Sequence, residues 1–413
     1  MKDFGYGDLG FYNISVLFLV YGIGSFFSTA TINKIGIKMG LVIGGVFKSL
    51  WVLGCVIPAY GAISEDKNYW LYSKEFIYPF QLIMSAICGI GNSLVWPAQG
   101  KYIADCANEQ TKGIYYGYFW AFYMSSQVIG NLIGAAVLAG GSYVNFFYIM
   151  ASLGMFASFL FLFLKKPRSN EVNISANKTD SDTQDLMMSS GSVSYQEGIQ
   201  IQTKTGVAED IKSVYYLLIS KRMIKFLPQL WYGGICVSVT TGMLVPIVVS
   251  CLDYEDTNKK SQVSLLIMTG LGAGEIVGGP GIGILIDRYG SKITSLLNCV
   301  LLLLSICVTL IALNIKVQIP VLCLLTFLWG CHDGALSSHT CEILGFQFDT
   351  KMEPFSIYNL NKSLMVFIFS IINSQVNVSN DRMTIYFSCV AVVGFFMCLN
   401  TYFFEFRKKD QPK

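Results

Sequence analysis

The chain has 413 residues, of which 53% are hydrophobic and 13% are charged, and its mean hydropathy is +0.52. A soluble domain averages about 25% charged residues, so this composition excludes an ordinary soluble protein and predicts a polytopic helical membrane protein. The net charge of +3 does not indicate a nucleic-acid partner, because the basic residues flank the apolar stretches. The twelve cysteines form no C-x-x-C pair, which favours small buried residues over a disulfide framework or a zinc site.

Eleven apolar stretches are each long enough to cross the hydrocarbon core of a bilayer as a helix, which takes about 20 residues. Between the fifth and sixth stretches, residues 169–205 are rich in polar residues, which predicts disorder. We therefore expect a five-helix N-terminal membrane bundle (1–164), a cytoplasmic and largely disordered linker (165–225), a six-helix C-terminal bundle (226–404) and a basic cytoplasmic tail (405–413). The predicted spans are 10–32, 39–58, 77–100, 113–139, 144–164, 226–250, 262–286, 293–313, 317–340, 355–378 and 383–404.

Lysine and arginine residues concentrate on one face of this predicted bundle. That face carries both ends of the linker, with Lys165 and Arg222, and the tail, with Arg407. Because cytoplasmic loops hold the excess of basic residues, we expect the linker and the C-terminus to be cytoplasmic. The odd number of spans then places Met1 on the opposite side of the bilayer.

The link between the seventh and eighth spans reads Gly-Ile-Leu-Ile-Asp-Arg-Tyr-Gly-Ser-Lys. Gly283 is expected to allow tight packing and Gly290 a sharp turn. Asp287 can pair with a basic group across the loop, and Arg288 and Lys292 mark a cytoplasmic face. The pattern resembles the conformational loop signature of the major facilitator superfamily, and the alternative is an ordinary positive-inside turn.

That resemblance implies a two-bundle fold of twelve helices, built from two six-helix repeats. In the second half the signature turn follows two spans, whereas its first-half counterpart at 29–38 follows only one. This counterpart has Asn33 where the superfamily favours Asp. Helix 1 of the usual twelve is therefore expected to be missing. An upstream segment could supply it, a partner could cover the gap, or the protein could work by a route other than the usual transport cycle.

Three motifs sharpen the resemblance. They are Trp-Pro-Ala-Gln-Gly at 96–100, Gly-Glu-Ile-Val-Gly-Gly at 274–279 and Gly-Cys-His-Asp at 330–333. In combination they resemble the uncoordinated-93-like family, the ion-channel regulatory branch of the major facilitator superfamily. The resemblance implies an accessory or trafficking partner of channels and receptors. Where relatives carry a lysine in their eleventh helix this chain has Asn359, and Lys362 lies about one turn later.

Charged residues inside the predicted spans are the first site candidates. Each costs about 2.5–3.5 kcal/mol to insert, so it needs a partner or a purpose. Glu275, Asp333 and Lys362 could form a proton- or ion-linked charge-coupling switch in the second half. The alternatives are a static buried ion pair, a Lys362 side chain that reaches to the membrane edge, and a Glu275 that only bonds a neighbouring backbone.

Polar and aromatic residues on one face of the third predicted span form a second set. Asn92, Trp96 and Gln99 are spaced i, i+4 and i+7, and the family fold points this face at a central cavity. They are candidates for binding a polar or aromatic solute, together with His332 and Asp333. Asn and Gln also serve as hydrogen-bonding glue between membrane helices, and that alternative stays open.

The chain's two histidines, His332 and His339, lie seven residues apart on one helix face. A metal site favours ligands at i and i+4, so no metal site and no cofactor are predicted. His332 beside Asp333 suits a pH-sensitive role. The sequence contains no G-x-S-x-G, P-loop or H-E-x-x-H motif, so we predict that the protein is not an enzyme.

Two functions remain in view. The first is a non-enzymatic accessory or regulatory partner of a channel or receptor, which follows from the family resemblance and the incomplete bundle. The alternative is a secondary active transporter of a small polar solute, with proton coupling through Asp333 or Glu275. The lipid bilayer is a partner in both, and a structural subunit of an organelle complex is a third reading.

Overall fold

The structure, a computed structural model, describes residues 4–64, 69–106, 112–140, 142–165, 207–315, 317–348, 353–376 and 379–406. The predicted disordered segment at 169–205 and the tail from residue 407 lie outside the described residues. Within the described part, eleven helices or helix pairs are long and apolar enough to cross a membrane, which confirms the predicted number of spans.

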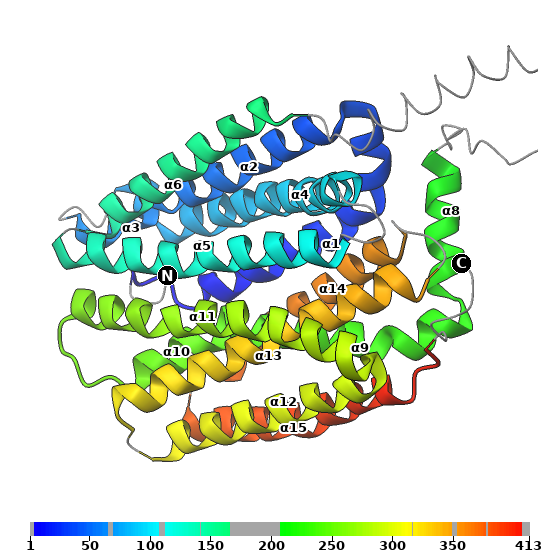
Figure 1. Ribbon diagram of the computed structural model, residues 1–413. Helices are drawn as coiled ribbons and strands as arrows, with labels where there is room; N and C mark the ends of the chain where they lie inside the picture. Colours follow the sequence, from blue (N-terminus) through cyan, green and yellow to red (C-terminus); the bar gives the residue numbers. More distant parts are fainter. Residues whose placement is uncertain are drawn as a thin grey trace, which may run out of the picture.

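The helices form two halves that lie side by side (Figure 1). The first half contains α1 (Leu9–Ile35), α2 (Ile37–Gly54), α3 (Val56–Ile63), the short η2 (Trp70–Tyr72), α4 (Lys74–Cys106), α5 (Lys112–Gly140), α6 (Tyr143–Leu160) and η3 (Phe161–Phe163). The second half contains α9 (Lys221–Ser238), η4 (Val239–Met243), α10 (Leu244–Ser250), α11 (Thr257–Tyr289), α12 (Ser291–Asn314), α13 (Ile319–Phe346), α14 (Glu353–Val376) and α15 (Asn380–Tyr402).

Two helix pairs join the halves, α1 with α14 and α5 with α11. Glycines bring both pairs close together. A Cβ atom on Gly22 of α1 would lie 3.1 Å from the Ser363 Cβ of α14. On α11, Gly272 packs in the same way against Val128 of α5. Small residues at such crossings let membrane helices gain van der Waals contact without a hydrophobic driving force.

The predicted internal repeat appears in the two short links. Gly36 ends α1 and starts α2 with φ +87°, and Gly290 ends α11 and starts α12 with φ +82°. A positive φ favours glycine, so the same turn occurs at the same place in both halves. Gly283 differs from its prediction, because no atom lies within 4 Å of a Cβ built on it and it makes no tight packing contact.

The span that opens the second half is not one continuous α-helix. A single π turn, η4, separates α9 from α10. The Asn373 amide of α14 donates to the Ser238 carbonyl at 3.2 Å and to the Ser238 hydroxyl at 3.0 Å, just before this turn. The side chain of a neighbouring helix therefore satisfies backbone that the π turn distorts, as bilayer-embedded helices require.

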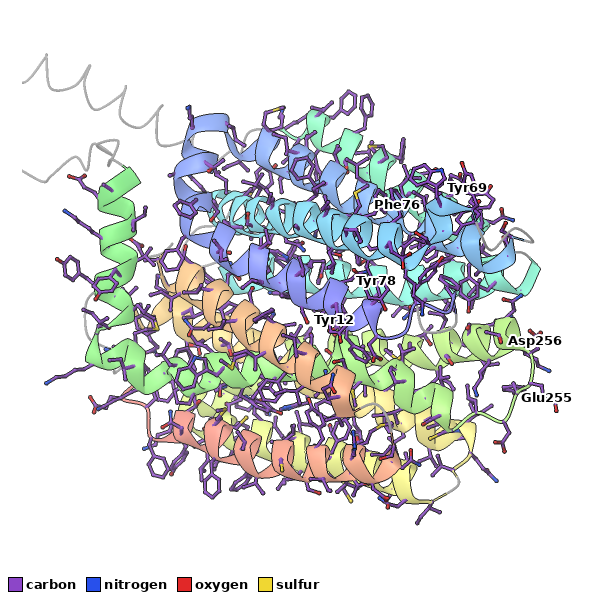
Figure 2. All side chains as sticks on the ribbon, turned by 180° about the vertical axis from the view of Figure 1, so that it is seen from behind. Tyr12, Tyr69, Phe76, Tyr78, Glu255 and Asp256 are labelled. Carbon is purple, nitrogen blue, oxygen red and sulfur yellow. The ribbon has the colours of Figure 1, made fainter. Side chains whose placement is uncertain are left out.

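Helix α8 (Val207–Leu218) lies across the ends of the membrane helices, at the end of the bundle where α9 begins (Figure 1). Its Val214 is buried, whereas Tyr215 and Tyr216 are exposed. α8 therefore occupies the last part of the predicted linker. Figure 2 shows Tyr69, Phe76 and Tyr78 at or toward the opposite end of the first half, as expected of aromatic residues near a membrane interface.

Candidate functional site

The three predicted charge-coupling residues come together in the structure. Glu275, Asp333 and Lys362 lie near the middle of α11, α13 and α14. Glu275 and Asp333 are buried, with 5% and 7% of their surface exposed, and Lys362 is half-buried. Lys362 interacts electrostatically with both carboxyl groups but forms no direct ion pair with either.

The two carboxyl groups form a pair. The side chains of Glu275 and Asp333 lie next to each other, and the Cys236 thiol of α9 lies close to Asp333. Two adjacent carboxylates repel strongly in a poorly solvated site, and such pairs are typical of proton relays in membrane carriers. Glu275 Oε2 and Asp333 Oδ1 have no hydrogen-bond partner, so the pair retains acceptor capacity.

Glycines explain how the pair can form. Gly330 and Gly334 of α13 lie directly against the Glu275 backbone of α11, and an added Cβ would lie 3.0 Å from it at Gly330 and 2.7 Å from it at Gly334. Gly274 and Gly278 make the matching approach from α11 to α13. The predicted close helix contact around Glu275 is therefore present, and it presses the two acidic side chains together.

Three tyrosines surround Lys362. Its ammonium group lies 5.2 Å from the ring centre of Tyr358, one turn earlier on α14. Tyr21 of α1 and Tyr123 of α5 interact electrostatically with Lys362 from the other half. We call Glu275, Asp333, Lys362, Tyr21, Tyr123 and Tyr358 the central cluster. It draws side chains from both halves at the depth where each helix is near its midpoint.

Four aromatic side chains of the first half adjoin this cluster. Trp96 of α4 stacks on Trp120 of α5 with ring centres 6.0 Å apart, and Tyr123 meets these rings at 5.2 and 5.6 Å. Phe119 stacks on Tyr123 at 6.0 Å. We call Trp96, Phe119, Trp120 and Tyr123 the aromatic wall. The Lys48 ammonium lies 5.8 Å from the Trp96 ring centre, in cation–π range.

The remaining sequence candidates are placed less centrally. Asn92 reaches Cys88 of its own helix at 4.0 Å, and Gln99 is half-buried. His332 is fully buried, and its Nε2 lies 2.7 Å from the Tyr232 hydroxyl of α9 in the core of the second half. It faces that core, although its neighbour Asp333 belongs to the central cluster. No group of three potential metal ligands occurs in the described part of the chain.

The loop signature holds two helix ends together. The Ser291 hydroxyl bonds Glu342 of α13 at 2.6 Å, and the Lys292 ammonium lies 4.8 Å from the Tyr402 ring centre of α15. Arg288 is exposed. The side chain of Asp287 lies outside the described residues, so its predicted pairing stays a prediction.

Sequence reasoning missed Tyr21, Tyr123, Tyr358 and Cys236. Tyr358 could have been found, because it precedes Lys362 by four residues and so shares its helix face. The other three come from helices distant in sequence, where no local pattern points at the cluster.

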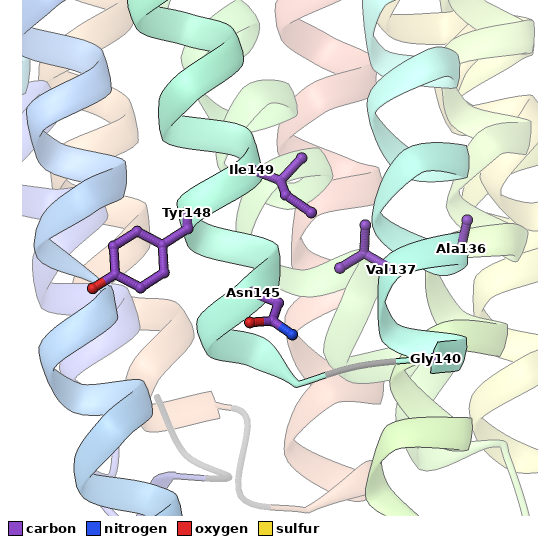
Figure 3. Close-up of a pocket in the computed structure, with 6 residues that line it drawn as sticks. All are labelled: Ala136, Val137, Gly140, Asn145, Tyr148 and Ile149. Carbon is purple, nitrogen blue, oxygen red and sulfur yellow. The ribbon is translucent and has the colours of Figure 1, made fainter.

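The first half has an open side. In the second half, α9 packs against α14 and α15. Among the described residues, no helix packs in the same way against α5 and α6 of the first half. A groove of about 410 Å³ lies between α5 and α6, as Figure 3 shows. Its lining residues are Ala136, Val137, Gly140, Asn145, Tyr148 and Ile149.

A family profile described as the Major Facilitator Superfamily matches residues 1–370. The chain belongs to the major facilitator superfamily. The likeness to uncoordinated-93-like proteins is also confirmed by curated relatives. UNC93-like protein MFSD11 of Xenopus tropicalis is 21% identical over 285 residues, which cover 67% of this chain and 57% of that protein. UNC93-like protein 3 of Arabidopsis thaliana is 26% identical over 144 residues, 30% of this chain and 31% of that protein.

The chain therefore spans less than two thirds of the length of either relative. Among solved structures, the xylose transporter XylE of E. coli in a partially occluded inward-open conformation matches with a TM-score of 0.69. The match covers 100% of this chain and 91% of that one at 13% identity. This likeness shows the fold, and with the eleven apolar spans it confirms the predicted all-helical facilitator architecture.

Proposed function

We propose that the protein is a secondary active transporter that binds a small polar solute between its two halves. The observation that supports this most directly is the central cluster, which brings a lysine, two carboxyl groups and three tyrosines together at mid-depth from both halves. Placing a charged or polar group inside a membrane costs free energy, so such groups usually mark a transport pathway or a proton relay. Parallel repeats also place a substrate site at their interface.

Proton coupling is the second part of this proposal. Glu275 and Asp333 are adjacent carboxyl groups in a poorly solvated site, where such groups can serve as a proton relay. Lys362 stands within electrostatic reach of both carboxyl groups. When the halves rock, Tyr21 and Tyr123 of the first half move relative to Lys362 and the two carboxyl groups of the second half, and access to the carboxyl groups changes with them. This cycle fits the family fold, in which alternating access arises from motion of one half against the other.

Asp333→Asn tests the transport role. The full chain is reconstituted in vesicles that enclose a pH-sensitive dye, and pooled sugars, amino acids and organic acids are added outside. We expect solute-dependent acidification with the wild type and its loss with Asp333→Asn. Glu255→Gln, a carboxylate-to-amide change in the exposed loop labelled in Figure 2, is the matched control and should behave as the wild type. No acidification with the wild type, or equal acidification with Asp333→Asn at equal protein level, would contradict the proposal.

A second candidate function is an accessory or regulatory partner of a channel or receptor. The observation that favours it is the open groove between α5 and α6, which is wide enough for side chains of another membrane helix. Transmembrane helices associate through small residues, and Ala136 and Gly140 offer such a surface. Under this proposal α8 and both ends of the linker face the cytoplasm, where a partner's soluble region could also contact them.

Filling the groove tests this candidate. The protein is purified in mild detergent and the chains that come with it are identified by intact mass. Val137→Trp should release a groove-bound channel or receptor chain without lowering protein abundance. Ile311→Trp, on the exposed face of α12, is the control and should retain that chain. A partner that survives Val137→Trp would bind elsewhere, and the groove would lose its assigned role.

A further inference from the structure

We propose that the solute is a small organic anion with an aromatic or apolar body. Lys362 of the central cluster binds the anionic group, and Trp96, Trp120 and Tyr123 of the aromatic wall bind the body. This inference rests on the transport function proposed above and names the class of solute for that same site.

Lys362 offers an accessible positive charge. It is half-buried, and no described carboxylate forms a direct ion pair with it. The Glu275 and Asp333 carboxyl groups interact with Lys362 electrostatically without forming a contact ion pair, so the lysine charge has no anionic partner in direct contact among the described residues. A cation in a poorly solvated site gains most from a ligand that brings the missing negative charge into contact.

The tyrosines complete an anion site around the lysine. The Tyr358 ring centre lies 5.2 Å from the Lys362 ammonium group, one turn earlier on the same helix. Tyr21 comes from α1, and its surroundings include Lys362, Tyr358 and Tyr123. A phenol donates one hydrogen bond, and donation to an ionised acceptor is stronger than to a neutral one. Three phenols around one ammonium group therefore favour a carboxylate or phosphate over an uncharged group.

Tyr123 connects the charged and the aromatic parts. It interacts electrostatically with Lys362, Glu275 and Asp333 of the second half, and its ring lies 5.2 Å from Trp96. It is also 41% exposed, so a ligand can reach it. A single small molecule can thus touch Lys362 with its anionic end and the wall with its body. Aromatic faces and edges bind flat apolar groups by stacking and edge-to-face contact.

The test uses two probes of nearly equal shape and different charge. Sodium benzoate and neutral benzamide are titrated into the full-length protein in lipid nanodiscs, and the heat of binding is measured. We expect benzoate to bind at least about tenfold more tightly than benzamide. Acetate and inorganic phosphate, which lack the body, should bind more weakly than benzoate.

Variants separate the two parts of the site. Lys362→Gln should abolish the preference for benzoate, and Lys362→Arg should keep it. Trp120→Ala should weaken both probes by a similar factor of about ten, because stacking does not depend on charge. Lys225→Gln, which removes an exposed lysine at the start of α9, is the control and should leave both affinities unchanged. Circular dichroism confirms that each variant is folded.

Equal affinity for the two probes in the wild type, or a benzoate preference that survives Lys362→Gln, would overturn the inference. The transport proposal fails in a different way. If benzoate binds more tightly than benzamide but no solute acidifies the vesicles, transport is wrong and the anion site stands. If vesicle acidification depends on Asp333 while benzoate and benzamide bind alike, transport stands and the anion class is wrong.

Discussion

The two halves have the same turns and the same pairwise packing, yet they differ in how well they are closed. In the second half, 72% of the most apolar stretch of the α9–α10 span is buried, the largest share among the spans of the described chain. The buried shares of α14 and α15, the two helices that this span contacts, are 44% and 33%. The buried shares of their first-half counterparts α5 and α6 are 22% and 11%, and no described helix covers these two. One central helix therefore accounts for most of the difference.

The grooves of the two halves repeat this comparison on a smaller scale. Each half has a lateral groove of about 410 Å³, one between α5 and α6 and the other between α14 and α15. In the second half Ile235 of α9 contributes to the lining, so the central helix backs the groove. In the first half the lining comes from α5 and α6 alone. The second half, which we call the closed half, carries the charged residues of the site. The first half, which we call the open half, supplies the aromatic wall.

The largest effect should come from the glycine contact that defines the closed half. Gly274 of α11 meets the backbone of α13 so closely that an added side chain has no room. We expect Gly274→Leu to cost about 3 kcal/mol or more, because backbone cannot move aside as a flexible side chain can. Thermal unfolding of the detergent-solubilised protein, followed by size-exclusion chromatography, measures this loss.

Two matched changes sharpen that result. Gly283 lies nine residues later on α11 with nothing near it, and Gly140 lies at the open end of α5 with nothing near it. Gly283→Leu and Gly140→Leu should each change stability by less than about 0.5 kcal/mol. If Gly140→Leu destabilises as much as Gly274→Leu, then the first half is closed by something that packs against α5.

Much of the fold could be predicted from the sequence because each span is a long apolar run and each tight turn needs a glycine. The positions of Gly36 and Gly290 and the number of spans follow from local pattern, whereas Glu275, Asp333 and Lys362 were found as charged residues inside apolar spans that need partners. The turn at Gly290 needs a positive φ, and the acidic pair follows from the glycines around Glu275.

The rest depends on contacts between segments that are distant in sequence. His332 was expected to act beside Asp333, but successive residues of an α-helix point about 100° apart. Asp333 therefore faces the central cluster, and His332 faces the core of the second half. Asn92 and Gln99 share a helix face with Trp96, yet only Trp96 contributes to the aromatic wall. Tyr21 and Tyr123 join the cluster because the halves pack together, and no local pattern encodes that packing.

A smaller effect should follow from the buried polar pair in the core of the closed half. Tyr232→Phe removes the partner of His332 Nε2, and His332 Nδ1 already has none. Leaving a buried imidazole unpaired should cost about 1–3 kcal/mol. Tyr148→Phe, on the open half, is the comparison: this side chain is 45% exposed near the start of α6, so its loss should cost less than about 0.5 kcal/mol. Equal costs would mean that Tyr148 is covered in the membrane.

The smallest effect should come from the ion pair between Lys225 and Glu405, which joins the start of α9 to the residues after α15 at 2.5 Å. The hydrogen bond and charge of Lys225 hold the pKa of the Glu405 carboxyl below its usual 4.5. A lowered carboxyl pKa adds stability above pH 4.5, and this contribution is lost as the pH falls through the lowered value. Both side chains are exposed, so the effect is small and screened by salt. The first half ties two of its helix ends without an acid, because Lys38 at the start of α2 donates to the Leu162 carbonyl after α6 at 3.1 Å. Glu405→Gln should therefore lower the melting temperature slightly near pH 7, and the melting curves of the wild type and Glu405→Gln should converge at acid pH.

Lys38→Gln is the control and should shift the melting temperature by the same amount at both pH values. A difference between the wild type and Glu405→Gln that persists at acid pH would show that the carboxyl acts there by packing alone.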